Sequence, residues 1–254
     1  MHNKKINDIE FSAGSWPLPP ELETIVFIHG SGGTNVLWDS QVEALSDQMN
    51  TVALNLPGHG NSSGNGMDSI GEYAKSVSNF IEGLKIARPV VCGLSIGGAI
   101  VLQLLIDGPE KYKAGIVVNA GAKLKVMPLI FEMIEKDYSG FVNGMYTFGV
   151  SPNTDPSRLK PLADSMMACP PDVTRNDFTA CDGFDVMDQL NKIKAPVLVM
   201  TASDDQLTPV KYGRFLADGI ESASMANIAD AGHLSPVEQP DDVSNAIRDF
   251  LAAL

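Results

Sequence analysis

Cysteine is scarce in this sequence, which contains three in 254 residues. An odd and small number of cysteines in a chain of this length argues against a disulfide framework. Cys92 lies in an apolar run, so we expect it to be a small buried side chain. Cys169 and Cys181 have no neighbours of ligand type at metal-binding spacing. The composition therefore predicts neither disulfides nor a metal site.

Long apolar runs are also missing. No stretch is long enough to span a bilayer, and residues 1–8 are polar where a signal peptide would need an apolar segment. We therefore expect a cytoplasmic protein that has no membrane partner.

Positive charge is in deficit, with 18 Lys and Arg against 31 Asp and Glu and a net charge of −13. Nucleic acids and anionic membrane surfaces repel a protein of this charge, so the sequence predicts neither as a partner. We expect the acidic side chains to form a solvated face that aids solubility.

Apolar runs alternate with helical patterns along most of the chain. The runs that predict buried strands lie at 24–28, 51–56, 89–92, 115–119 and 196–200. Helices are predicted between them, at 38–49, from Ser69 onward and at 96–106. This alternation implies an α/β fold with a mostly parallel central sheet and helices on both faces. Residues 6–11 are expected to add one edge strand, followed by a proline-rich linker at 16–20.

The alternation breaks between Lys123 and Leu190, where no buried strand is evident. This segment contains six of the eleven methionines and five of the ten phenylalanines, partly in stretches with helical spacing. We predict a helical cap at 123–190, inserted into a core formed by 1–122 and 191–254. Its apolar side chains would pack the cap onto the core and form a soft wall over a site.

A short glycine-rich motif stands between the predicted strand at 89–92 and the helix after it. Its residues are Gly93-Leu94-Ser95-Ile96-Gly97, the G-x-S-x-G pattern of a nucleophile elbow. In such an elbow, a tight strand-to-helix turn exposes a serine hydroxyl beside the N-terminus of a helix. The pattern also occurs in ordinary glycine-rich turns, so further segments must support it.

Acidic residues and a histidine follow the later predicted strands. Asp204 and Asp205 come after the strand at 196–200, and His233 follows a strand-like run at 223–228. Each lies at the carboxyl edge of the predicted sheet, where open α/β sheets place their sites. The chain order of serine, acid and histidine is the order expected for an α/β-hydrolase.

Two more segments strengthen a resemblance to the α/β-hydrolase superfamily. They are Phe27-Ile28-His29-Gly30-Ser31-Gly32-Gly33 and Leu56-Pro57-Gly58-His59-Gly60-Asn61-Ser62. With the elbow and the acid and histidine loops, the matching segments span positions 27 to 240. The resemblance implies the α/β-hydrolase fold with a helical cap insertion.

The resemblance also implies a role for each member of a catalytic triad. Ser95 would be the nucleophile, His233 the general base, and Asp205 the carboxylate that orients the histidine. In the family the acid stands four residues before a proline, so Pro209 favours Asp205 over the adjacent Asp204.

An oxyanion formed at the serine would need two donors. The resemblance implies the backbone N–H of Ile96 and that of Ser31, with Gly32 as the alternative to Ser31. The resemblance also implies that His29 shapes the glycine-rich loop at 29–33, the oxyanion loop, which contains Ser31 and Gly32. At one structural position the chain departs from the family, because Asn55 stands where aspartate is common.

These residues predict a serine hydrolase that cleaves small to medium or aromatic carboxylic esters through an acyl-enzyme. Ser95 excludes haloalkane dehalogenases and epoxide hydrolases of this fold, which use aspartate at the elbow. Thioesterase, enol-lactonase and perhydrolase share the triad and stay open, as does a ligand-binding or signalling protein with slow turnover. A proline iminopeptidase ranks low, because no acidic cluster for a substrate amine is evident. No cofactor is implied, the expected partner is a small-molecule ester, and the oligomeric state stays open.

Overall fold

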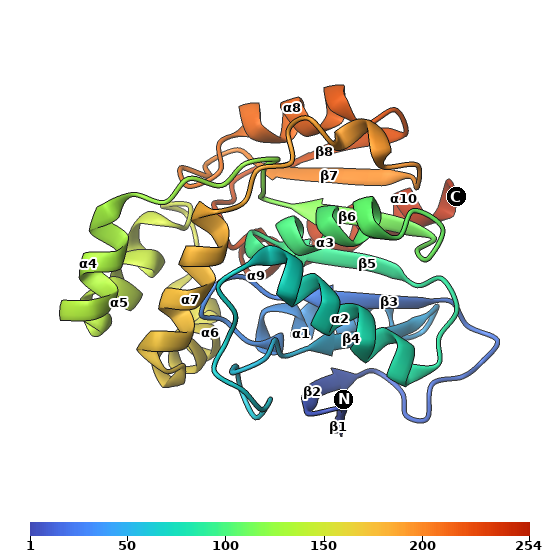
Figure 1. Ribbon diagram of the computed structural model, residues 1–254, viewed down its shortest axis with the longest axis horizontal. Helices are drawn as coiled ribbons and strands as arrows, with labels where there is room; N and C mark the ends of the chain where they lie inside the picture. The colour runs from blue at the N-terminus through green and yellow to red at the C-terminus, as the bar shows by residue number, and fades with distance from the viewer.

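Eight strands form one central sheet in the computed structural model, which describes residues 1–254. Their order across the sheet is β1-β2-β4-β3-β5-β6-β7-β8 (Figure 1). The strands are β1 His2–Ile6, β2 Ile9–Ala13, β3 Thr24–Ile28, β4 Asn50–Leu54, β5 Val90–Leu94, β6 Ala114–Val118, β7 Val197–Ala202 and β8 Ala223–Ile228. All pairs from β4 to β8 are parallel, which confirms the predicted α/β fold with a mostly parallel sheet.

The N-terminal segment differs from the single edge strand predicted at 6–11, and that prediction is wrong. The chain forms an antiparallel hairpin of β1 and β2 that turns at Asn7 and Asp8. Both turn residues have positive φ, of 47° and 66°, which Asn and Asp tolerate better than most residues. Because β2 pairs with β4, its Phe11 side chain is fully buried and β1 becomes the edge.

Helices cover both faces of the sheet (Figure 1). Those of the core are α1 Asp39–Leu45, α2 Ile70–Leu84, α3 Ile96–Asp107, α8 Val210–Gly219, α9 Ser235–Glu238 and α10 Pro240–Ala252, with 3-10 turns η1 Asn35–Trp38 and η2 Leu190–Lys192. Alternate residues of β3 pack into separate apolar clusters, because successive strand side chains point to opposite faces. Val26 and Ile28 pack with α2 and α3, whereas Ile25 and Phe27 pack with α1 and α10.

Four helices lie between β6 and β7 and gather at one end of the sheet, on the left of Figure 1. We call them the insertion helices: α4 Pro128–Lys136, α5 Tyr138–Phe148, α6 Pro156–Ala168 and α7 Pro171–Asp182. They have a small apolar cluster of their own, formed by Ile134, Phe141, Val142 and Met166. An isolated antiparallel bridge between Lys123 and Asp185 joins the two ends of the segment.

No helix of the protein combines the length and the apolar character needed to cross a bilayer.

Candidate active site

Ser95 occupies the sharp turn between β5 and α3. Its backbone has φ 57° and ψ −117°, a conformation that is strained for a residue with a side chain. The flanking glycines are required by close packing. A Cβ at Gly93 would lie 2.2 Å from the carbonyl carbon of Gly97, and one at Gly97 would lie 2.5 Å from the carbonyl oxygen of Ile28. The elbow pattern in the sequence thus corresponds to a turn that admits no side chain two residues before or two residues after the serine.

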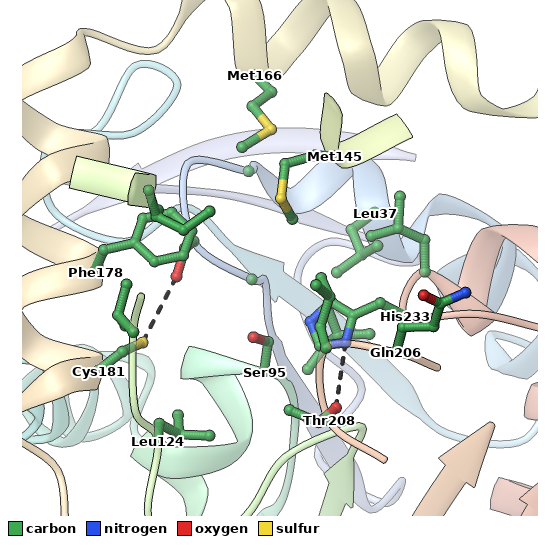
Figure 2. Close-up of a pocket in the computed structure, with 18 of the residues that line it drawn as sticks. Leu37, Ser95, Leu124, Met145, Met166, Phe178, Cys181, Gln206, Thr208 and His233 are labelled. Atoms are coloured by element: carbon green, nitrogen blue, oxygen red, sulfur yellow. Dashed lines mark hydrogen bonds between the residues drawn. The ribbon is translucent and has the colours of Figure 1, made fainter. Parts of the chain in front are cut away.

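Asp205 and His233 meet at the carboxyl ends of β7 and β8. The Nδ1 atom of His233 lies 2.9 Å from Oδ2 of Asp205, and both side chains are buried. The backbone N–H groups of Leu207 and Thr208 donate to Oδ1 of Asp205, at 2.8 and 2.9 Å. The hydroxyl of Thr208 donates to Oδ2 at 2.6 Å and also lies 3.3 Å from His233 Nδ1 (Figure 2).

These contacts keep the Asp205 carboxylate ionised. Burial alone would raise the pKa of Asp205, but the facing His233 and the hydrogen bonds from Thr208 outweigh burial and lower it to about 2. Asp204 has a different environment, because its Oδ2 accepts a hydrogen bond from the Ser151 hydroxyl at 2.6 Å. Of the two adjacent acids, the structure brings Asp205 to the histidine.

Ser95 and His233 face the same cavity, which has a volume of about 270 Å³. Figure 2 shows the serine hydroxyl at the cavity floor, with Met145 and Met166 above it and Phe178 to one side. Most of the lining is apolar and comes from the loops of the core and from the insertion helices.

The backbone N–H groups of Ser31 and Ile96 have no hydrogen-bond acceptor in the protein. Ile96 is the first residue of α3, so its N–H also lies at the positive end of the helix dipole. Gly32, the alternative to Ser31, donates its N–H to Oδ2 of Asp177 at 2.8 Å. The Gly32 donor is therefore occupied, whereas the N–H of Ser31 is free.

Asp177 of α7 is the centre of a buried polar network under the loop after β3 (residues 29–33). Besides Gly32, its carboxylate accepts hydrogen bonds from His59 Nε2 at 2.9 Å and from the Tyr73 hydroxyl. The His59 and Asp177 side chains are fully buried. Burial alone would lower the pKa of His59, but the Asp177 carboxylate outweighs it and raises that pKa to about 10. The core and α7 therefore share an ion pair at neutral pH.

His29 lies beside this pair, with its ring centroid 4.8 Å from that of His59. Its Nδ1 lies 2.8 Å from the carbonyl oxygen of Gly30, and its Nε2 accepts the Leu56 N–H at 3.0 Å. Burial and the neighbouring His59 lower the pKa of His29 to about 3, so its ring is neutral. A neutral His29 therefore joins the start of the loop after β3 to the segment after β4.

Glu238 is a second buried carboxylate that the sequence analysis did not single out. Its Oε2 accepts the N–H groups of Gly232 and Ser151 at 2.9 and 2.7 Å, and its Oε1 accepts that of Leu234 at 2.9 Å. The carboxylate therefore holds both neighbours of His233 and joins them to the loop after α5.

Sequence reasoning also missed Asp177, although α7 carries a signal for it. The buried face of this helix is formed by Val173, Thr174, Asp177, Ala180 and Cys181. An acidic residue on an otherwise mostly apolar helix face indicates a buried partner, because an unpaired buried carboxylate is costly.

Asn55 has a role that an aspartate could not fill. Its Nδ2 donates to the Glu10 carboxylate at 2.7 Å, while its Oδ1 accepts the Asn35 N–H at 2.7 Å. An amide can donate and accept at the same time, whereas a carboxylate here would face Glu10 with like charge. The departure from the family pattern is explained by this local contact.

A hydroxyl, a buried histidine with a carboxylate partner and two free N–H donors around an apolar cavity form an arrangement suited to acyl transfer. No group of three or more His, Cys, Asp or Glu side chains is placed to hold a metal ion.

Comparison with known proteins gives consistent matches over nearly the whole chain. Residues 25–246 match the sequence model of the alpha/beta hydrolase family. A pimeloyl-(acyl-carrier protein) methyl ester esterase of Nitrosomonas europaea is 24% identical, over 85% of this chain and 91% of its own length. The 3-oxoadipate enol-lactonase 1 of Acinetobacter baylyi is 24% identical, over 93% of this chain and 91% of its own. The crystal structure of an enol-lactonase from Burkholderia xenovorans LB400 has the same fold, with a TM-score of 0.90, 23% identity and coverage of 99% of this chain and 100% of that one.

Proposed function

This chain belongs to the alpha/beta hydrolase family, and we propose that it is a serine hydrolase that cleaves carboxylic esters through an acyl-enzyme at Ser95. One observation carries the proposal: His233, paired with the ionised Asp205, lines the same apolar cavity as Ser95. The expected partner is a small-molecule ester.

In the proposed reaction, the Ser95 hydroxyl attacks the ester carbonyl while the neutral imidazole of His233 takes its proton. Asp205 stabilises the imidazolium that results. The N–H groups of Ser31 and Ile96 donate hydrogen bonds to the carbonyl oxygen and stabilise the negative charge that develops on it. The imidazolium then returns the proton to the leaving alcohol, and a water molecule activated by His233 releases the acid.

We further propose that residues 123–190 act as a cap that sets the size of the acyl group. The insertion helices supply Met145 and Met166 to the cavity, and methionine adapts to ligands of irregular shape. A cavity of about 270 Å³ accommodates small to medium or aromatic acyl groups. The similarity to an enol-lactonase also makes lactones, which are cyclic esters, a substrate class to test.

The three cysteines are free thiols, which supports a reducing compartment such as the cytoplasm as the site of action.

The decisive experiment combines active-site labelling with turnover. A fluorophosphonate probe should label the wild-type protein and not Ser95→Ala, and mass spectrometry should place the adduct on the Ser95 peptide. A series of p-nitrophenyl esters should then be hydrolysed over many turnovers. A single burst without further turnover would instead identify a ligand-binding protein that keeps the triad.

A further inference from the structure

The cavity beside Ser95 is almost free of charged side chains. Apart from His233, its only ionisable side chain with a cationic form is that of Lys125, and no Asp or Glu lines it. The remaining walls are apolar or neutral. An anionic group of a substrate would therefore depend on Lys125 for a counter-charge.

Lys125 already has an acidic partner outside the cavity. Its ammonium donates to the carbonyl oxygen and to Oδ1 of Asp182, both at 3.1 Å. The N–H of Val126 donates to the same Oδ1 at 3.2 Å. These hydrogen bonds, from Val126 first and then Lys125, lower the pKa of Asp182, so its carboxylate stays ionised at neutral pH.

The wider electrostatic environment also disfavours an anion. Asp205 places a negative charge behind His233, and the protein as a whole has a net charge of −13. A carboxylate that enters an apolar cavity without a cation loses its hydration and gains no ion pair, which is strongly unfavourable.

We propose that this cavity takes esters with uncharged acyl chains and excludes acyl chains that end in a carboxylate, because its walls are mostly apolar and Lys125, its one cationic side chain apart from His233, is already paired with Asp182 at the cavity edge. The inference rests on the proposed function and specifies its substrate class.

A matched substrate pair tests the charge requirement in the wild-type protein. The p-nitrophenyl ester of methyl adipate and that of hydrogen adipate have the same chain length and differ in the terminal charge. Adipate also avoids the rapid self-cleavage that a nearer carboxylate causes in shorter diacids. At pH 7.5 we expect kcat/KM to be at least about 100-fold higher for the methyl ester, because the anion would be desolvated without a partner.

A variant tests the role assigned to the ion pair. Asp182→Asn keeps the shape of the side chain but removes its charge, so that the Lys125 ammonium can bind a substrate carboxylate. It should raise kcat/KM for the hydrogen adipate ester about threefold to fivefold, the effect of one partly exposed ion pair, and leave the methyl ester unchanged. Adding Lys125→Met to this variant should remove the gain.

Asp185→Asn is the matched control. Asp185 forms a similarly exposed ion pair with Lys123 in the same region, and Lys123 does not line the cavity. This variant should have the same ratio of kcat/KM values for the two adipate esters as the wild type. The melting temperature of each variant should be measured to verify folding.

The outcomes separate the inference from the proposed function. Loss of all activity, including on p-nitrophenyl acetate, would overturn the esterase assignment itself. Equal kcat/KM for the two adipate esters would refute the exclusion of anions while the esterase assignment stands. Turnover of acetate but of neither adipate ester would also refute it, since chain length would then decide. An equal increase in kcat/KM for the hydrogen adipate ester in Asp182→Asn and in Asp185→Asn would refute the role assigned to Lys125.

Discussion

Substituting Asp177 with asparagine tests how the insertion supports the oxyanion loop. The change keeps the side-chain shape but removes the charge that faces His59, with which it forms a fully buried pair. Removing one partner of such a pair costs about 3–5 kcal/mol in stability. We expect the free energy of unfolding to fall by about 3 kcal/mol at pH 7. This is the lower end of the range, because His59 can become neutral and the amide can still accept one hydrogen bond.

The same substitution should slow the chemical step. The Asp177 carboxylate holds the Gly32 N–H at 2.8 Å, and Gly32 directly follows Ser31 in the oxyanion loop. A weaker acceptor lets the loop relax and moves the Ser31 N–H from its position beside the cavity. Loss of one oxyanion donor lowers kcat by about 10²–10³-fold, so partial misplacement should lower it by about 10-fold to 100-fold. KM should change less than kcat, because the hydrogen bond from the Ser31 N–H to the substrate oxygen strengthens only in the transition state.

The pH dependence of stability gives an independent readout. The raised pKa of His59, about 10 in the folded protein against an ordinary 6.5, means that the folded state binds the proton more tightly than the unfolded state. The resulting stability is fully present below pH 6.5 and is lost as the pH rises through about 10. Urea unfolding should therefore show that the difference in the free energy of unfolding between the wild type and Asp177→Asn narrows as the pH rises from 6.5 to about 10.

Asp172→Asn provides the control, because Asp172 is exposed in the first turn of the same helix. It should change stability by less than about 1 kcal/mol and leave kcat unchanged. The reasoning is refuted if Asp177→Asn matches this control in kcat, or if its stability deficit stays constant from pH 7 to pH 9.5.

Other substitutions probe the triad and the cavity wall. Ser95→Ala should lower kcat for p-nitrophenyl butyrate by about 10⁴-fold or more, and retention of a tenth of the activity would exclude Ser95 as nucleophile. Asp205→Asn should reduce kcat far more than Asp204→Asn in the same assay, since only Asp205 contacts the histidine; equal losses would contradict this assignment. Met145→Ala should shift the preferred acyl chain length by about 10-fold in the ratio of kcat/KM values, because Met145 lines the cavity. Phe141→Ala should instead lower the melting temperature with little change in that ratio, because Phe141 is buried among the insertion helices.

Local patterns in the sequence predicted much of this arrangement. The elbow at Ser95 is encoded within five residues, because the glycines and the serine must stand at fixed spacing for the turn to form. The fold class followed from buried strands at regular intervals, since a parallel strand needs a crossover before the next. The hairpin at the N-terminus was missed because Asn7 and Asp8 form a turn without the glycine that usually marks one.

Contacts between segments that are distant in the sequence could not be predicted from such local patterns. His59 and Asp177 are 118 positions apart, and nothing near either residue indicates the other. The contact between Ser151 and Glu238 likewise depends on how the insertion lies over the core. Such pairs form only when packing brings two elements together, so a single sequence shows each polar residue but not its partner.

The contacts of Glu238 and His233 have a consequence for engineering. The N–H of His233 donates to the carbonyl oxygen of Gly149 at 2.6 Å, and Glu238 holds the N–H of Ser151. Both acceptor and donor belong to the stretch that leaves α5. The insertion is therefore not an interchangeable module. A chimera that imports the corresponding segment from another hydrolase must also reproduce these two backbone contacts, or the loop that contains His233 will lose its support.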